Sequence, residues 1–162
     1  MDLFKYTAHE LHEKLVNKEI TAVEITNAVY DRIVAVDEQV NAYISLSKEE
    51  ALAKAAEVDA KIAAGEAIAP LAGIPVVFKD NINIYGQVTS CASKMLQGVE
   101  TVFDAHVTEE LRKEDAVFLG KANMAEFSIG NTTDNSYNGA AHNPWNLNCT
   151  TGGCATAAAV AA

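Results

Sequence analysis

Apolar residues between positions 1 and 65 recur at the spacing of amphipathic helices. Leu11 and Leu15 follow a capping-box pair, Thr7 with Glu10, and predict a helix over residues 8–17. A second capping pair, Thr21 with Glu24, precedes a helix expected at about 22–37. The apolar stripe of this second helix consists of Ile25, Val29, Ile33 and Val36.

A third helix is expected between Ser47 and Gly65. Ser47 with Glu50 forms another capping pair, and Gly65 stands where the end of a helix favours glycine. The segment 42–46, just before this helix, alternates apolar and polar residues in the manner of a strand.

The pattern changes after Leu71, where short apolar runs begin to alternate with helical segments. Residues 74–78 and 116–119 are continuous apolar runs, which are typical of strands buried on both faces, and residues 105–114 predict a helix. Residues 80–104 and 122–153 are rich in loop-forming residues, and the alanine run 157–162 predicts the start of a further helix. This order of elements predicts an α/β fold, and the length of 162 residues predicts one domain.

Charge and composition argue against several functions. The chain has 12 Lys and Arg residues against 22 Asp and Glu, a net charge of −10, which disfavours binding to nucleic acid or to an anionic membrane surface. The N-terminus lacks the apolar run of a signal peptide, and no stretch reaches about 18 apolar residues. We therefore expect a cytoplasmic protein without a membrane segment, whose three cysteines are reduced thiols.

Lys79, which follows the apolar run 74–78, is a candidate for catalysis. Burial favours the neutral amine of lysine, and a neutral amine can take a proton from a hydroxyl, as in the Ser–Lys type of nucleophilic catalysis. The alternative interpretation is that Lys79 lies just past the strand and points into water. Judged by composition alone, this alternative is favoured.

The turn Gly152-Gly153-Cys154 presents a small nucleophile-like side chain ahead of an alanine run. Backbone N–H groups at such a helix start can bind an oxyanion, but an ordinary glycine turn explains the same residues equally well. A metal site is disfavoured, because Cys149, Cys154, His106 and His142 match no standard zinc spacing.

Several short segments, taken in order, resemble the amidase signature family. These segments are Pro70-Leu71-Ala72-Gly73-Ile74-Pro75, Lys79-Asp80-Asn81, residues 89–96, residues 119–127, Asn135-Ser136, Asn143-Pro144-Trp145 and Gly152-Gly153. Within the family, residues 91–96 and 121–127 are most similar to the subunits that supply ammonia for tRNA-dependent amidation.

The resemblance implies an α/β domain with a mixed central sheet covered by helices, of which residues 1–162 would be a truncated, N-terminal portion. The family's catalytic triad is a lysine, a serine held by a cis peptide bond and a nucleophilic serine. Lys79 matches the lysine, and Cys154 stands where the cis-serine is expected, directly after Gly152-Gly153. The nucleophilic serine would lie beyond residue 162. We therefore expect Lys79 within reach of Cys154, a cis bond at Cys154–Ala155, and no glutaminase activity from these residues alone.

The reaction implied by the resemblance is the hydrolysis of glutamine through an acyl-enzyme, with Lys79 as the base acting through residue 154. The ammonia would pass to a partner subunit that amidates an ATP-activated glutamyl-tRNA. The expected partners are glutamine and the B and C subunits of a heterotrimer, with tRNA held only through the partner. We expect this chain to bind no cofactor, because ATP and Mg²⁺ would be used by the partner subunit.

Two other interpretations stay open. The chain could be a non-catalytic truncated paralogue, or gene fragment, that binds the partner subunits, or a fragment of another amidase-signature hydrolase. In each case we expect the first three helices and the strand at about 74–78 to form. The segment 149–162 is expected to be the least ordered, and uncovered apolar surface is expected to promote self-association.

Overall fold

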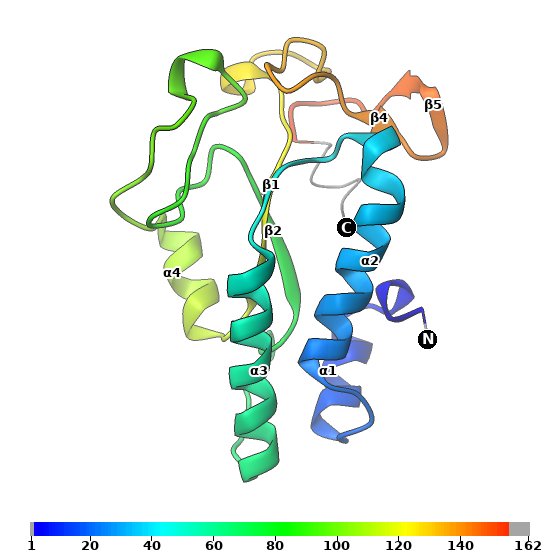
Figure 1. Ribbon diagram of the computed structural model, residues 1–162, viewed down its shortest axis with the longest axis vertical. Coiled ribbons are helices and arrows are strands. Elements are labelled where there is room, and N and C mark those ends of the chain that lie inside the picture. The colour runs from blue at the N-terminus through cyan, green and yellow to red at the C-terminus, as the bar shows by residue number, and fades with distance from the viewer. Residues whose placement is uncertain (1, 156–162) are drawn as a thin grey trace. The chain divides into compact units, whose positions relative to one another are not determined.

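The computed structural model describes residues 2–155 of the chain (Figure 1), so the alanine run 157–162, for which a helix is expected, lies outside the described residues. The described helices are α1 (Ala8–Val16), α2 (Ala22–Val40), α3 (Lys48–Ala64) and α4 (His106–Lys113). Three short 3-10 turns accompany them: η1 (Leu3–Lys5), η2 (Lys94–Leu96) and η3 (Glu126–Ser128). The four predicted helices are therefore confirmed.

Local side-chain signals explain where α1 and α2 begin. The Glu10 N–H donates to the Thr7 hydroxyl and the Thr7 N–H donates to the Glu10 carboxylate, which completes a capping box. Thr21 and Glu24 exchange the same two hydrogen bonds, at 2.8 and 3.1 Å. The prediction of a third capping pair, Ser47 with Glu50, is wrong. Ser47 makes no capping bond with its side chain, because its ψ of 54° departs from the extended conformation of Thr7, whose ψ is 158°.

Three strands form a mixed sheet in the order β1-β3-β2, with β1 at Tyr43–Leu46, β2 at Pro75–Lys79 and β3 at Val117–Ala122. β1 is antiparallel to β3 and places Leu46 opposite Gly120. β2 runs in the same direction as β3, since Val117 N–H donates to Ile74 O at 2.9 Å and Asp80 N–H donates to Ala122 O at 3.1 Å. The predicted α/β fold with a mixed sheet is thus confirmed, although β3 extends past the apolar run 116–119 through its pairing with β1.

A separate hairpin pairs β4 (His142–Asn143) with β5 (Asn146–Thr150) in antiparallel orientation. The expectation of a loop throughout residues 122–153 is wrong here. Every residue of β5 is exposed, so this strand is held by pairing with its neighbour rather than by apolar burial. The hydrophobic pattern of the sequence therefore could not predict β5.

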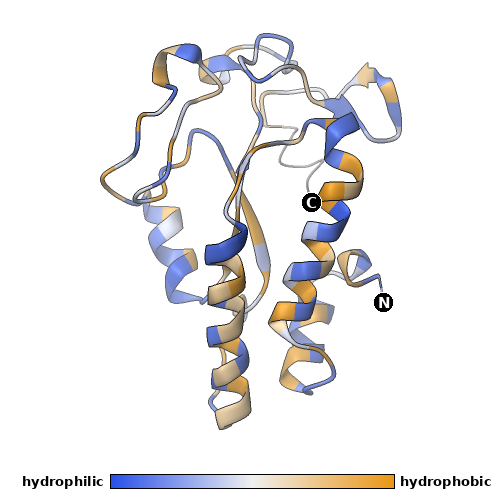
Figure 2. Cartoon of the chain, in the orientation of Figure 1, coloured by the Kyte–Doolittle hydropathy of each residue, from blue (hydrophilic) through white to orange (hydrophobic). Residues whose placement is uncertain are grey.

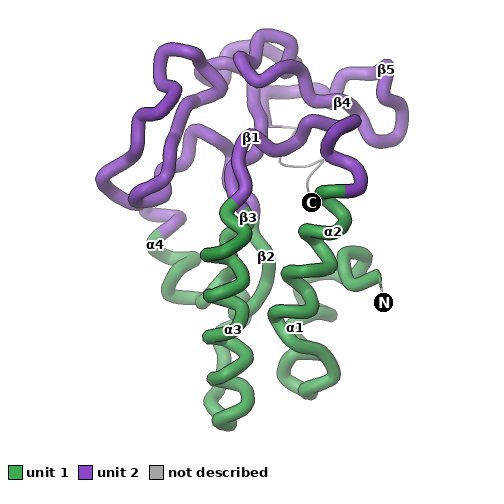
Figure 3. The backbone as a smooth tube through the Cα atoms, in the orientation of Figure 1, with its two compact units in different colours: residues 1–34, 47–76, 109–119 green, residues 35–46, 77–108, 120–162 purple. Residues whose placement is uncertain are grey.

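The chain forms two compact units (Figure 3): residues 1–34, 47–76 and 109–119 make unit 1, and residues 35–46, 77–108 and 120–162 make unit 2. In unit 1, hydrophobic and hydrophilic residues alternate along the helices (Figure 2), and the apolar Leu15, Ile25 and Val58 are inaccessible to solvent. Unit 2 contains β1, the long loops and the candidate site. The expectation of one domain over residues 1–162 stays a prediction. Within residues 2–155, no helix combines the length and apolarity needed to cross a bilayer.

Candidate active site

Lys79, the last residue of β2, is half-buried in unit 2 and points its amine at two other side chains. The Nζ atom donates to Ser128 Oγ at 3.0 Å and to Cys154 Sγ at 3.4 Å. The expectation that Lys79 reaches Cys154 is confirmed, and the amine does not stand free in water as the alternative interpretation would have it. The catalytic roles of these two residues stay predictions.

Ser128 was not singled out from the sequence, although it is the nearer of the two partners of Lys79. It ends the turn η3, in which Phe127 has φ 49° and Ser128 has φ 61°. Left-handed backbone is uncommon in residues other than glycine and is often found at functional sites. The Asn81 side-chain amide also faces the Ser128 hydroxyl, at 3.4 Å. The only sequence signal was the position of Ser128, immediately after the family-like segment 119–127.

A buried asparagine holds the long loop next to this site. Asn123 follows β3 and is inaccessible to solvent. Its amide N–H₂ donates to Asn41 O at 3.1 Å and to Gly139 O at 2.9 Å, and its Oδ1 accepts from the Ser136 hydroxyl at 2.7 Å. The side chain thereby ties three separate segments of unit 2 together, which explains how a loop-rich region keeps a defined course.

Cys154 follows two glycines in left-handed conformation, Gly152 with φ 70° and Gly153 with φ 68°. This is the expected glycine turn, and it leaves Cys154 partly exposed beside Lys79. The expected cis bond at Cys154–Ala155 is wrong, since no cis peptide occurs among residues 2–155. A cis bond without proline costs about 3 kcal/mol and persists only where its surroundings impose it.

The remaining cysteines and histidines do not extend the site. Burial raises the pKa of the Cys91 thiol, and the charge of Asp80 raises it further, so Cys91 is a protonated thiol at neutral pH. His142 and Cys149 lie on the exposed β4–β5 hairpin. In the part of the chain from residue 2 to residue 155, no three His, Cys, Asp or Glu side chains gather in a way that would hold a metal ion.

The arrangement can support proton transfer. A lysine amine within hydrogen-bond distance of a thiol and a hydroxyl has two groups through which a proton can move when the amine is neutral. A thiol is the weaker donor and acceptor of the two, so the hydroxyl of Ser128 is the stronger partner of Lys79 in this chain.

Comparison with known proteins identifies relatives of this chain. A family model described as Amidase matches residues 24–162. The chain is 52% identical over 161 residues to the A subunit of the glutamyl-tRNA(Gln) amidotransferase from Clostridium botulinum (strain Loch Maree), covering 99% of this chain and 33% of the relative. It is 49% identical over 164 residues to the protein of the same name from Desulforamulus reducens, covering 34% of that protein.

Solved structures agree with the sequence comparison. One belongs to a vestigial protein complex that reveals the origins of an s-triazine catabolic enzyme, and it matches 96% of this chain with a TM-score of 0.93 and 30% identity. The peptide amidase from Stenotrophomonas maltophilia matches 97% of this chain with a TM-score of 0.88 and 33% identity. In each case about a third of the other chain is covered, 34% in both.

The chain thus spans about a third of the length of the curated relatives that it matches. Both the family model and the solved structures confirm the resemblance that the ordered motifs indicated. The chain belongs to the amidase family.

Proposed function

We propose that this chain provides the lysine-bearing part of a glutamine-hydrolysing subunit, which supplies ammonia for the amidation of glutamyl-tRNA(Gln). The observation that carries this proposal is the contact of Lys79 Nζ with Cys154 Sγ, in a chain that is about half identical to proteins named as the A subunit of that amidotransferase. The net charge of −10 is consistent with tRNA being held by another subunit.

In the proposed reaction, the neutral amine of Lys79 takes a proton from residue 154, which in turn takes one from the nucleophilic hydroxyl. That hydroxyl attacks the side-chain amide of glutamine, and ammonia leaves as the acyl-enzyme forms. Water then releases glutamate. Lys79 holds the proton between these steps and returns it to the leaving group.

The proposed partners are the B and C subunits of the heterotrimer, and the proposed location is the cytoplasm. The B subunit would use ATP and Mg²⁺ to activate the glutamyl-tRNA and would receive the ammonia, so this chain itself would need no cofactor. The alternatives are a non-catalytic chain that only binds those subunits, and a hydrolase of the same family that acts on another amide.

A chimera tests the proposal directly. Residues 1–155 of this chain replace the matching segment in the Clostridium botulinum relative, and ammonia release is measured with glutamine, a peptide amide and an aryl acylamide as substrates. We expect glutamine to be preferred. Lys79→Ala should lower kcat by about a thousandfold, because it removes the base, whereas Lys113→Ala, a change at an exposed lysine of α4, should have no effect.

Cys154→Ser in the same chimera should raise kcat, since a hydroxyl exchanges protons through stronger hydrogen bonds than a thiol. Preference for either of the other two amides would favour the alternative hydrolase. A chimera that is inactive on all three, together with co-purification of this chain with the B and C subunits, would favour the non-catalytic interpretation.

A further inference from the structure

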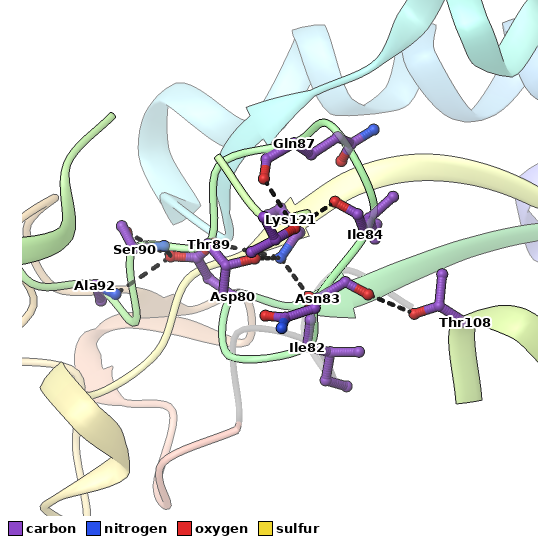
Figure 4. Close-up of polar contacts among 11 residues, drawn as sticks. Asp80, Ile82, Asn83, Ile84, Gln87, Thr89, Ser90, Ala92, Thr108 and Lys121 are labelled. Carbon is purple, nitrogen blue, oxygen red and sulfur yellow. Dashed lines mark hydrogen bonds and ion pairs between the residues drawn. The ribbon is translucent and has the colours of Figure 1, made fainter. Parts of the chain in front are cut away.

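Lys121 is a fully buried lysine that the proposed reaction does not use. Its side chain lies in unit 2 and is inaccessible to solvent. Its Nζ donates to Ile82 O at 2.6 Å and to Thr89 Oγ1 at 3.0 Å (Figure 4). The nearest carboxylate oxygen is Asp80 Oδ1, at 3.6 Å. Burial lowers the pKa of Lys121, and the Asp80 charge opposes this shift. Burying a charged lysine costs free energy, so the contacts that Lys121 makes in the core indicate a role in holding neighbouring residues in place.

The partner of Lys121, Asp80, follows Lys79 directly in sequence and is also buried. Its second oxygen, Oδ2, accepts from the N–H and hydroxyl of Ser90, at 3.1 and 2.5 Å, and from the N–H of Ala92 at 3.2 Å (Figure 4). The backbone O of Asp80 accepts from Cys91 N–H at 3.1 Å. Asp80 therefore fixes the whole turn 90–92.

The turn 90–92 is hydrogen-bonded to Phe127, the residue before Ser128. Cys91 and Ala92 both have φ 52°, and in this conformation Cys91 O accepts from Phe127 N–H at 3.0 Å. Phe127 and Ser128 are themselves left-handed, at φ 49° and 61°. Such backbone persists only where its surroundings determine it, and the bond from Phe127 to Cys91 is one such determinant.

These contacts connect Lys79 with Ser128 through the residues between them. Asp80 follows Lys79 in sequence and holds the turn 90–92, and Cys91 O of that turn accepts from Phe127 N–H. Ser128 follows Phe127 and accepts from Lys79 Nζ at 3.0 Å. We propose that Ser128 is a positioning residue for Lys79, and that the buried Asp80–Lys121 pair holds the turn from which Ser128 acts. The role in catalysis rests on the function proposed above, whereas the positioning itself is independent of it.

The experiment measures how fast acetic anhydride modifies the Lys79 amine in the full chain, by peptide mass spectrometry across a range of pH. The exposed amines of Lys5 and Lys113 serve as internal references. Ser128→Ala should raise the modification rate of Lys79 by about five- to tenfold, the effect of losing one hydrogen bond of ordinary strength. Ser45→Ala, at an exposed serine of β1, should leave the rate unchanged.

Ser128→Gly separates the hydroxyl from the backbone, because glycine adopts φ 61° without strain. If the hydroxyl holds Lys79, the Gly and Ala variants give the same rate increase. An unchanged rate in both variants would overturn the proposal, and so would an increase confined to one of them.

The role of the buried pair is tested with Thr89→Val, a change of similar shape that removes one hydrogen-bond partner of Lys121 and retains the fold more readily than loss of the charge. We expect a rise of about two- to threefold in the Lys79 rate, and a larger rise with Lys121→Met if that variant remains folded by circular dichroism. A Thr89→Val rate equal to wild type would overturn the part of the proposal that concerns the pair.

In the chimera, Ser128→Ala should lower kcat about tenfold with little change in KM. If the chimera and all its variants lack glutaminase activity while the modification rates of Lys79 still change as expected, the proposed function fails and the positioning role of Ser128 stands. If the modification rates do not change, the positioning role fails whatever the activity.

Discussion

At the scale of single residues, Tyr30 shows how a buried polar group in unit 1 is satisfied by a distant backbone oxygen. The side chain is 1% exposed, and its hydroxyl donates to Leu119 O at 2.8 Å. Burial raises the pKa of Tyr30 to about 12, and the charge of Glu50 contributes in the same direction. The neutral phenol is thus the form that the folded state stabilises.

Tyr30→Phe should lower the free energy of unfolding by about 1 kcal/mol at neutral pH, because Leu119 O loses the buried Tyr30 donor and keeps only the N–H of Ser47. The pKa of Tyr30 in the folded state, about 12, lies above its ordinary value of 10.0, so the unfolded chain ionises first. Wild-type stability therefore falls as pH rises from about 10 to about 12, and the variant lacks this loss.

Urea unfolding at neutral pH and at about pH 11 measures both effects. We expect the difference between wild type and Tyr30→Phe to shrink at the higher pH. A difference that stays constant would mean that Tyr30 has the same pKa in the folded and unfolded states.

At the scale of elements, the pairing of β1 with β3 depends on the absence of a side chain at one position. Gly120 has φ 145° and lies opposite Leu46 in the sheet. A Cβ atom added there would lie 2.9 Å from Leu46 Cα and would also collide with Ser45 O. The two strands approach so closely that only glycine fits at this point.

Gly120→Ala should therefore destabilise the protein by about 3 kcal/mol or more, since backbone atoms have to move apart. Gly86→Ala is the matched control: Gly86 is also left-handed, at φ 74°, but an added Cβ meets nothing within 4 Å. The control should cost only about 1 kcal/mol, the effect of the backbone conformation alone. Thermal or urea unfolding of both variants gives the comparison, and equal losses would show that the close approach at Gly120 is relieved without cost.

At the scale of the whole molecule, large apolar side chains stay in contact with solvent. Within unit 2 they form two groups along the chain, residues 85–107 with Met95 and Val102 at 81% each and Phe103 at 60%, and residues 127–147 with Trp145 at 95%. Exposed apolar residues gathered in one segment promote association, whereas single ones are ordinary.

We expect the purified chain to bind a hydrophobic dye and to self-associate with rising concentration, as measured by fluorescence and light scattering. The double change Val102→Ser and Phe103→Ser should reduce both signals. Val34→Ser, at a 77% exposed position of α2 outside these segments, should change neither. A wild-type chain that is monomeric and silent toward the dye would contradict this prediction.

Much of the fold could be predicted from short-range patterns. α1 and α2 begin where their capping pairs predict, because capping acts between neighbours in the chain. α3 also begins after Ser47 as expected, although Ser47 makes no capping bond with its side chain. The strand at β2 could be predicted from its apolar run. The β4–β5 hairpin could not, since its exposed strands carry no hydrophobic pattern.

The candidate site, too, could be predicted from the sequence only in part. The sequence by itself determined that Lys79 and Cys154 are candidates for the same site, because both occupy positions in the ordered family-like motifs. Only the tertiary structure decided that Ser128 contacts the amine, across a separation of 49 residues, and that Lys121 is buried against Asp80. The physical reason is that serine and lysine are ordinary surface residues by composition. Their hydrogen bonds depend on left-handed turns and strand pairing, which are set by contacts distant in sequence.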